Sequence, residues 1–208
     1  MKPATEHPAV TVTVTERRRL TALAGHVGDH RAARAGLSDP APSVRVTSLG
    51  ALARLGSLAD EDLRAALADA APAVRRRACE LAKDHPAVDI SRQLDDTDSS
   101  VVEMAAWAMG ERVERSSVPA LAALASAHSG HPDPLCREAA VASLGAIGDA
   151  GGLPAVIDAL DDKPAIRRRA AVALAAFDGP AAEAALRRCL EDRDWQVRQV
   201  AEDLLAVE

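Results

Sequence analysis

The chain has 208 residues, of which 48% are hydrophobic and 27% are charged, and its formal net charge is −6. This apolar content excludes a disordered chain, and the lack of a long uncharged apolar run excludes a membrane span. Alanine occurs 47 times against three aromatic residues, which favours helices, because β-sheets draw on aromatic and β-branched side chains. We therefore expect an all-α protein.

The charge and the cysteines indicate the environment. A net negative charge disfavours attraction of the whole surface to nucleic acid or anionic lipid. The first twenty residues lack the apolar stretch of a secretory signal. Cys79, Cys136 and Cys189 are far apart and odd in number, which fits reduced thiols better than a disulfide framework. We expect a cytoplasmic protein whose cysteines act as small buried hydrophobic residues.

In chain order, residues 1–15 predict a flexible leader, and a repeat follows from residue 16 onward. Each copy opens on an apolar residue, mostly followed by arginine, and has a small residue four positions later. The openers are Val44, Val74, Val101, Cys136, Ile166 and Val197, spaced by 30, 27, 35, 30 and 31 residues. Residues 16–27 form an earlier, looser copy. Larger apolar residues stand eight positions after five of the six openers and eleven positions after three of them, and they complete one face of an amphipathic helix.

Shorter apolar-periodic segments predict a second helix in each copy. They cover residues 29–37, 60–68, 86–94, 118–127, 153–160 and 180–190. Gly28, Gly56 and Gly148 follow predicted helix ends, as C-terminal caps do. The sequence thus predicts about thirteen helices, arranged as six helix pairs plus a closing helix, in one domain over residues 16–208.

An aspartate precedes the opener by five residues in five of six copies. These residues are Asp39, Asp69, Asp96, Asp161 and Asp192, whereas the fourth copy has His131. We expect each aspartate to accept hydrogen bonds from backbone N–H groups of its turn, and the arginine after an opener to reach a neighbouring turn's aspartate. A row of ligand-binding residues would have the same pattern, but its repetition favours a structural ladder.

These residues carry a family resemblance. The pattern Asp-x4-Val-Arg-x2-Ala-Ala-x-Ala-Leu-Gly, seen in residues 161–174 and 138–145, resembles the HEAT repeat, in particular its bilin-lyase-like (PBS lyase) variety. The resemblance implies a right-handed α-solenoid of HEAT repeats. Members of the family include scaffolds, bilin lyases, a di-iron hydroxylase of a modified lysine and, more distantly, alkylpurine DNA glycosylases, so the resemblance leaves the function open.

By the same resemblance, the opener helices line the inner, concave surface, where a partner would bind. Positions 2, 3, 6 and 10 after an opener then face the partner, because positions 0, 4, 8 and 11 face the core. The expected partner-binding residues are Trp107, Glu103, Met104, Glu111, Glu138, Arg76, Arg77, Arg168 and Arg169. Residues 84–115 hold eight acids against three arginines, a net charge of 3 − 8 = −5, which predicts an acidic middle flanked by arginine pairs.

The two tryptophans are expected to differ. An exposed Trp107 beside methionine and carboxylates would be a protein-binding hot spot, but a lone tryptophan in an alanine-rich helix slightly favours the alternative, in which Trp107 packs against the next repeat. Trp195 is expected to pack within a turn.

Catalytic and metal-binding patterns are weak. A di-iron site would need histidine–glutamate pairs on the inner helices, and those positions carry no histidine. His128, His131 and Cys136 are the one zinc-like cluster, but Cys136 occupies a core position, which favours a solvated loop. No phosphate loop or nucleophile motif occurs. We therefore expect no cofactor and no metal.

The leading hypothesis is a non-enzymatic scaffold, monomeric, which binds a protein or peptide along its inner face. A bilin-lyase-like or other small-molecule enzyme is the alternative, and a nucleic-acid binder of HEAT type is the third hypothesis.

Overall fold

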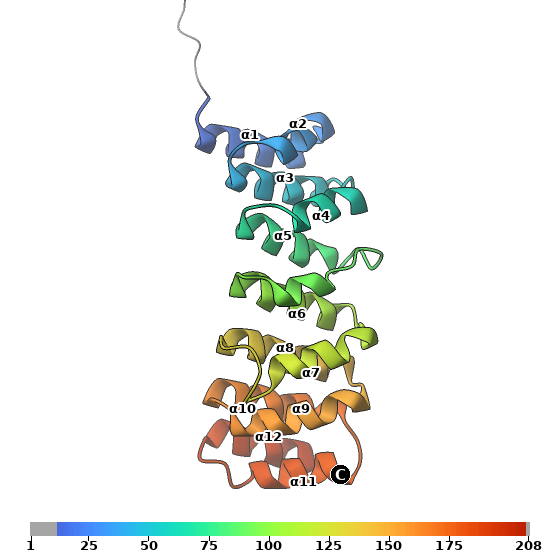
Figure 1. The fold of residues 1–208 in the computed structure, drawn as a ribbon, viewed down its shortest axis with the longest axis vertical. Helices are drawn as coiled ribbons and strands as arrows, with labels where there is room; N and C mark the ends of the chain where they lie inside the picture. The colour runs from blue at the N-terminus through green and yellow to red at the C-terminus, as the bar shows by residue number, and fades with distance from the viewer. Residues whose placement is uncertain (1–11, 207–208) are drawn as a thin grey trace, which may run out of the picture. The chain divides into compact units, whose positions relative to one another are not determined.

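A computed structural model describes residues 12–206, and these residues are all helical or connecting, with no strand among them. The chain divides into two compact units, Met1–Asp62 and Leu63–Glu208. Each unit is described by itself (Figure 1). The predicted leader falls largely on residues outside the described range, and the expectation of a single domain over residues 16–208 stays a prediction.

The first unit contains three α-helices and a 3₁₀ helix. They are α1 (Val14–Val27), α2 (His30–Ala35), η1 (Gly36–Ser38) and α3 (Pro42–Arg54), and α4 (Asp60–Leu67) begins at its end. Thr13 caps α1, since its hydroxyl accepts a hydrogen bond from the backbone N–H of Glu16. α1 packs against both α2 and α3.

The second unit repeats the same alternation. Its helices are α5 (Pro72–Ala82), η2 (Ser91–Asp95), α6 (Ser99–Glu111), η3 (Arg115–Ser117), α7 (Val118–Ala125), α8 (Pro134–Ile147), η4 (Ala150–Gly152), α9 (Leu153–Asp158), η5 (Ala159–Asp161), α10 (Pro164–Ala173), η6 (Leu174–Ala176), α11 (Pro180–Cys189) and α12 (Trp195–Leu205).

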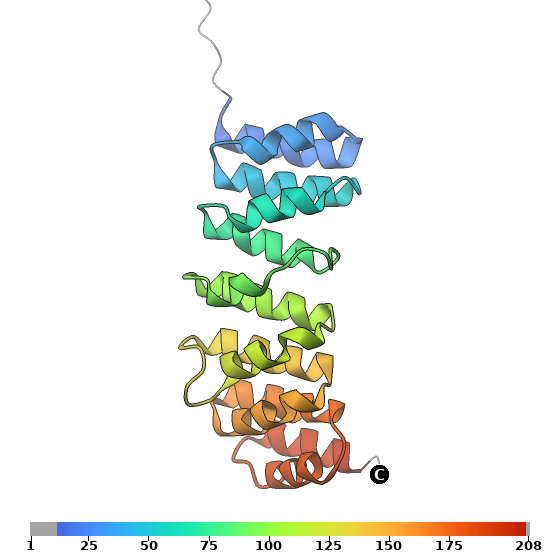
Figure 2. The ribbon, with the colours of Figure 1, turned by 45° about the vertical axis from the view of Figure 1, so that its right-hand side comes forward.

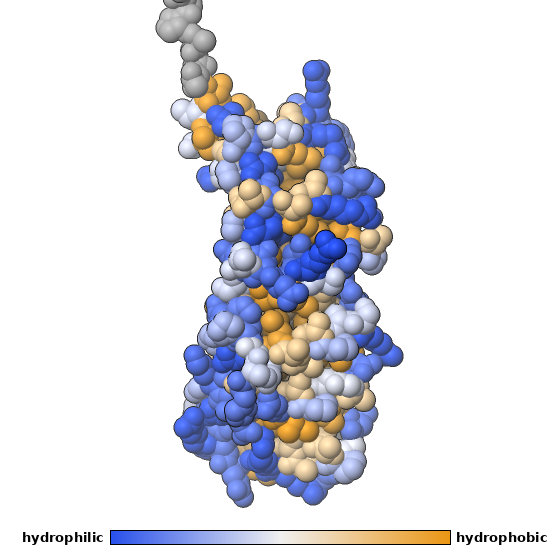
Figure 3. Space-filling model, viewed as in Figure 1, coloured by the Kyte–Doolittle hydropathy of each residue, from blue (hydrophilic) through white to orange (hydrophobic). Residues whose placement is uncertain are grey.

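The helices of the second unit form two rows. α5, α6, α8, α10 and α12 contact one another in succession, and they lie side by side in both ribbon views (Figures 1 and 2). We call them the inner row. α7, α9 and α11 contact one another along a second row. The surface over α7 is largely apolar, with polar side chains at its edges (Figure 3). This stacked arrangement is that of an α-solenoid and confirms the predicted fold class.

The predicted core register is confirmed. All six openers and all six small residues four positions later are buried. Gly28, Gly56 and Gly148 have φ of 83°, 63° and 61°, so they end their helices in the left-handed region that only glycine adopts at no cost.

The predicted helix over residues 86–94 is wrong. The described residues contain twelve α-helices, and this segment is irregular up to the 3₁₀ helix η2. Its backbone is held instead by Arg112, whose guanidinium donates hydrogen bonds to the carbonyls of Ala82, His85 and Val88. Arg112, the residue that follows α6, thus satisfies carbonyls at the end of α5, in the turn after it and in the irregular segment itself.

The predicted arginine–aspartate ladder is present. Each rung is a bidentate pair between an arginine near the start of one helix and an aspartate in the turn before the first helix of the following repeat. The rungs are Arg17–Asp39 in the first unit, and Arg75–Asp96, Arg137–Asp162 and Arg167–Asp192 in the second. The carboxylates of Asp39, Asp96 and Asp192 also accept a hydrogen bond from the N–H two residues later. The ladder therefore fixes both the stacking of helices and the shape of each turn.

Two details of the ladder differ from the prediction. Asp162, not Asp161, forms the rung with Arg137, because this turn is one residue shorter and places the second aspartate in reach. The rung between α6 and α8 is missing on both sides, since Val102 stands at the arginine position and His131 at the aspartate position. At His131 only the backbone takes part: its carbonyl accepts a hydrogen bond at 2.7 Å from Nη1 of Arg137, which also forms the next rung with Asp162.

Candidate partner-binding site

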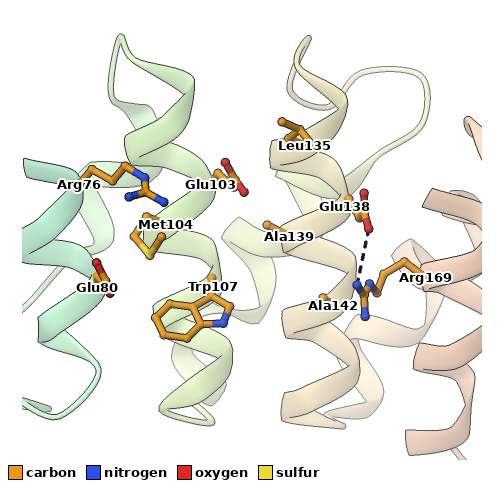
Figure 4. Close-up of a pocket in the computed structure, with 10 residues that line it drawn as sticks. All are labelled: Arg76, Glu80, Glu103, Met104, Trp107, Leu135, Glu138, Ala139, Ala142 and Arg169. Atoms are coloured by element: carbon orange, nitrogen blue, oxygen red, sulfur yellow. Dashed lines mark ion pairs between the residues drawn. The ribbon is translucent and has the colours of Figure 1, made fainter. Parts of the chain in front are cut away.

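A hollow of about 470 Å³ opens on the inner row, in the second unit, across α5, α6, α8 and α10. Ten residues line it: Arg76, Glu80, Glu103, Met104, Trp107, Leu135, Glu138, Ala139, Ala142 and Arg169 (Figure 4). The surface is therefore built from equivalent positions of successive repeats.

α6 provides the apolar middle of the hollow. Val101, Ala105 and Met109 bury the opposite face of this helix. Met104 and Trp107, one turn apart, consequently project into the hollow, where both are half-buried (Figure 4). The sequence left open whether Trp107 faces outward or packs in the core. In the structure its side chain lines the hollow.

α8 provides the space beside the tryptophan. Ala139 and Ala142 occupy the positions that correspond to Met104 and Trp107 one repeat earlier. Because alanine has no side chain beyond Cβ, the surface of α8 is recessed beside the half-buried indole of Trp107. Leu135, which is 55% exposed, adds apolar surface at the start of α8.

The charged side chains around this middle are only partly paired. Arg77 lies 2.7 Å from Glu80, and Arg169 lies 3.6 Å from Glu138. The side chains of Arg76 and Glu103 form no hydrogen bond or ion pair with any described residue; Arg76 extends toward α6, and the Glu103 carboxylate lies on the side of α6 that faces α8 (Figure 4). One guanidinium and one carboxylate are thus available to a ligand.

The structure gathers six of the nine predicted residues in the hollow. The other three lie outside it. Arg77 forms an ion pair with Glu80. Arg168 contacts Asp194 and Gln196 of the last repeat. Glu111 is exposed at the end of α6. The predicted set omitted Leu135, Glu80 and the two alanines. Positions 3 and 6 of the predicted register do cover Glu80, Ala139 and Ala142, so only Leu135 falls outside that register.

The expectation for Trp195 is wrong. Its side chain is 64% exposed, at the first position of α12 after the capping Asp194. Four helices of the inner row carry proline or serine at this first position, which points away from the core because it lies two residues before the buried opener.

The predicted zinc-like residues His128, His131 and Cys136 each contact a different partner. His128 Nδ1 lies 3.6 Å from Asp158, whereas His131 Nδ1 accepts a hydrogen bond from the N–H of Asp133. Cys136 is buried and its thiol donates to the carbonyl of Ser99. Across residues 12–206, no three histidine, cysteine, aspartate or glutamate side chains are grouped to hold a metal ion.

The cysteines are buried as predicted, and none of the three forms a disulfide. Burial raises the pKa of the Cys79 thiol to about 12, and the pKa values of Cys136 and Cys189 to about 11. Such thiols are poor nucleophiles and poor metal ligands at neutral pH.

Comparison with known proteins agrees with the repeat architecture. A family model described as HEAT repeats matches residues 90–163 and 123–206, which together cover more than half of the chain. No curated protein matches the sequence. None of the described helices is long and apolar enough to cross a membrane.

Solved structures with the same fold include the Escherichia coli protein YibA, with 18% identity and a TM-score of 0.63, covering 94% of this chain and 76% of that one. The complex of CpcE and CpcF of phycocyanin lyase from Nostoc sp. PCC7120 is similar at 24% identity and a TM-score of 0.57, covering 98% of this chain and 79% of that one. The predicted likeness to the bilin-lyase variety is therefore present in the fold.

Proposed function

We propose that this chain, which belongs to the HEAT-repeat family, is a non-enzymatic scaffold that binds a protein or peptide partner at the hollow around Trp107. The observation that carries the proposal is the pair Met104 and Trp107, both half-buried, beside the recess over two alanines of α8. One unpaired guanidinium and one unpaired carboxylate border this apolar surface. A rigid aromatic surrounded by polar groups is typical of an interface hot spot.

The residues of the hollow favour binding over catalysis. Its lining contains arginine, glutamate, methionine, tryptophan, leucine and alanine, but no serine, threonine, cysteine, histidine or lysine. Nucleophilic catalysis and most proton transfers near neutral pH depend on one of those missing residue types. The three glutamates of the hollow are half-buried, and two of them, Glu80 and Glu138, lie within 4.0 Å of an arginine.

The arginines of the inner row favour a protein partner over nucleic acid. Arg77, Arg168 and Arg169 each lie within 4.0 Å of an acidic side chain of the chain itself. Phosphate binding depends on cations that are free to neutralise it. Among the arginines predicted to bind a partner, only Arg76 meets that condition.

The proposal is tested by capturing partners from extracts of the source cell with the wild-type chain and with Trp107→Ala/Glu103→Lys. We expect the principal partner to be lost from the double variant, because the apolar anchor is removed and the local charge reversed. Trp195→Ala is the matched control, since it removes an equally large exposed indole away from the hollow. Unchanged capture by the double variant would refute the site, and a chromophore that copurifies with the chain would favour the small-molecule alternative.

A further inference from the structure

Across α5, α6, α8 and α10, the charge on the inner row changes sign twice. The second position after each opener is Arg76 on α5, Glu103 on α6, Glu138 on α8 and Arg168 on α10, so the row is positive at both ends and negative in the middle. The sixth position is apolar across the same middle, with Trp107 on α6, Ala142 on α8 and the 49% exposed Val172 on α10. A carboxylate row and an apolar row thus run in parallel across α6 and α8.

We propose that the partner is an extended peptide segment carrying a single lysine or arginine next to an apolar residue, with one acidic residue two or four positions from the lysine or arginine. This inference rests on the proposed function and specifies the chemistry of the partner. In an extended chain, adjacent side chains point to opposite sides. The cation is then directed to Glu103 and Glu138, while the neighbouring apolar residue packs against Trp107 and Ala142.

The acidic residue follows from Arg76. Adjacent packed helices are about 8–10 Å apart and an extended chain advances about 3.3 Å per residue, so α5 lies roughly two to four residues from a cation held over α6 and α8. Arg76 has no partner among the described residues and can therefore pair with a carboxylate of the ligand without giving up an existing bond.

The same pattern excludes a polybasic segment. Arg76 and Arg169 border the acidic middle on either side (Figure 4), so further lysines or arginines along the peptide would meet like charges. Arg169 lies 3.6 Å from Glu138, a long contact that the ligand's cation can share.

The test starts from a displayed library of random short peptides, selected on the wild-type chain. Dissociation constants of a selected peptide are then measured by titration calorimetry. We expect Glu103→Lys to weaken binding at least about tenfold, and a peptide with its lysine changed to glutamate to recover most of that loss on the Glu103→Lys variant. Glu111→Lys is the matched control, because it makes the same charge change on the same helix outside the hollow.

The outcomes separate the two proposals. If no peptide is selected, or if Trp107→Ala does not weaken binding, the proposed function fails. If peptides bind through Trp107 but are polybasic, or bind Glu103→Lys and wild type equally, the proposed function stands and the partner chemistry inferred here is overturned. Circular dichroism and melting curves of each variant establish that it is folded.

Discussion

Val113 is the single described residue other than glycine with a positive φ, at 52°. It follows α6 in the conformation that Gly56 adopts after α3, with the same pattern of N–H groups returning to carbonyls of the last turn. A β-branched residue there costs about 1–2 kcal/mol relative to the right-handed conformations. The valine side chain is 51% exposed, so little packing compensates.

Val113→Gly is therefore expected to stabilise the chain, by about 1 kcal/mol once the greater chain entropy of glycine in the unfolded state is deducted. Urea denaturation followed by circular dichroism measures the change. Val172→Gly is the control, because Val172 is similarly exposed but lies within α10, where glycine should destabilise. Destabilisation by Val113→Gly would show that the valine makes a favourable contact in solution.

Two features of single residues could not be predicted from the sequence, the positive φ of Val113 and the hydrogen bonds of Arg112. Gly28, Gly56 and Gly148 were predictable as caps because glycine signals a positive φ, whereas Val113 carries no such signal. Arg112 likewise resembles an ordinary helical arginine in the sequence, yet it satisfies three carbonyls, one at the end of α5 and two in the irregular stretch after it, that precede it by more than twenty residues. Such long-range hydrogen bonds leave no periodic trace in the sequence.

At the scale of the element, inner helices approach one another closely at glycines nine positions after the opener. A Cβ added to Gly145 would lie 2.7 Å from Cβ of Ala173 and 2.9 Å from its Cα, and Gly110 meets Ser143 in the equivalent way. Gly25 of the first unit meets Ala51 similarly. The recurrence shows that the packing of one pair of helices is repeated along the chain.

Gly145→Ala should destabilise the chain by about 1–3 kcal/mol, although alanine is the better helix former by about 1 kcal/mol, because α8 and α10 must move apart to admit the methyl group. Thermal or urea unfolding provides the measurement. Ala146→Gly, at the exposed neighbouring position, isolates the intrinsic propensity and should cost only about 1 kcal/mol. A stabilised Gly145→Ala variant would contradict the close contact.

The elements themselves were largely predictable, because the register of apolar residues was sufficient to define every inner helix. The segment over residues 86–94 was not, since its apolar residues Val88, Ile90 and Leu94 are buried without helical regularity. The candidate site could be predicted only in part. The register identified Trp107, Met104 and Glu103 as facing outward, but the recess beside them depends on packing between helices that the sequence of one repeat does not reveal.

At the scale of the whole molecule, the arginine–aspartate rungs make stability depend on pH. Hydrogen bonds from Arg17, Arg75 and Arg167 lower the pKa of Asp39, Asp96 and Asp192 below the ordinary value of 3.8. A carboxylate with a depressed pKa in the folded state stabilises that state above the unfolded pKa, and this contribution is lost as the pH falls through the folded value. The free energy of unfolding should therefore change little near neutral pH and decrease below about pH 4.

Asp96→Asn tests this origin directly, because asparagine keeps the shape of aspartate and removes its charge. At pH 7 the variant should be less stable than wild type by about 1–3 kcal/mol, the range for a hydrogen bond to a charged group. The difference should shrink as the pH falls below about 4 toward the lowered pKa of Asp96, since wild type then loses the same charge by protonation. Asp95→Asn, at an exposed neighbouring position, should be close to neutral at every pH. Urea denaturation of the three proteins between pH 7 and pH 3 measures both effects, and a difference for Asp96→Asn that does not vary with pH would assign its role to packing rather than to the charge of the rung.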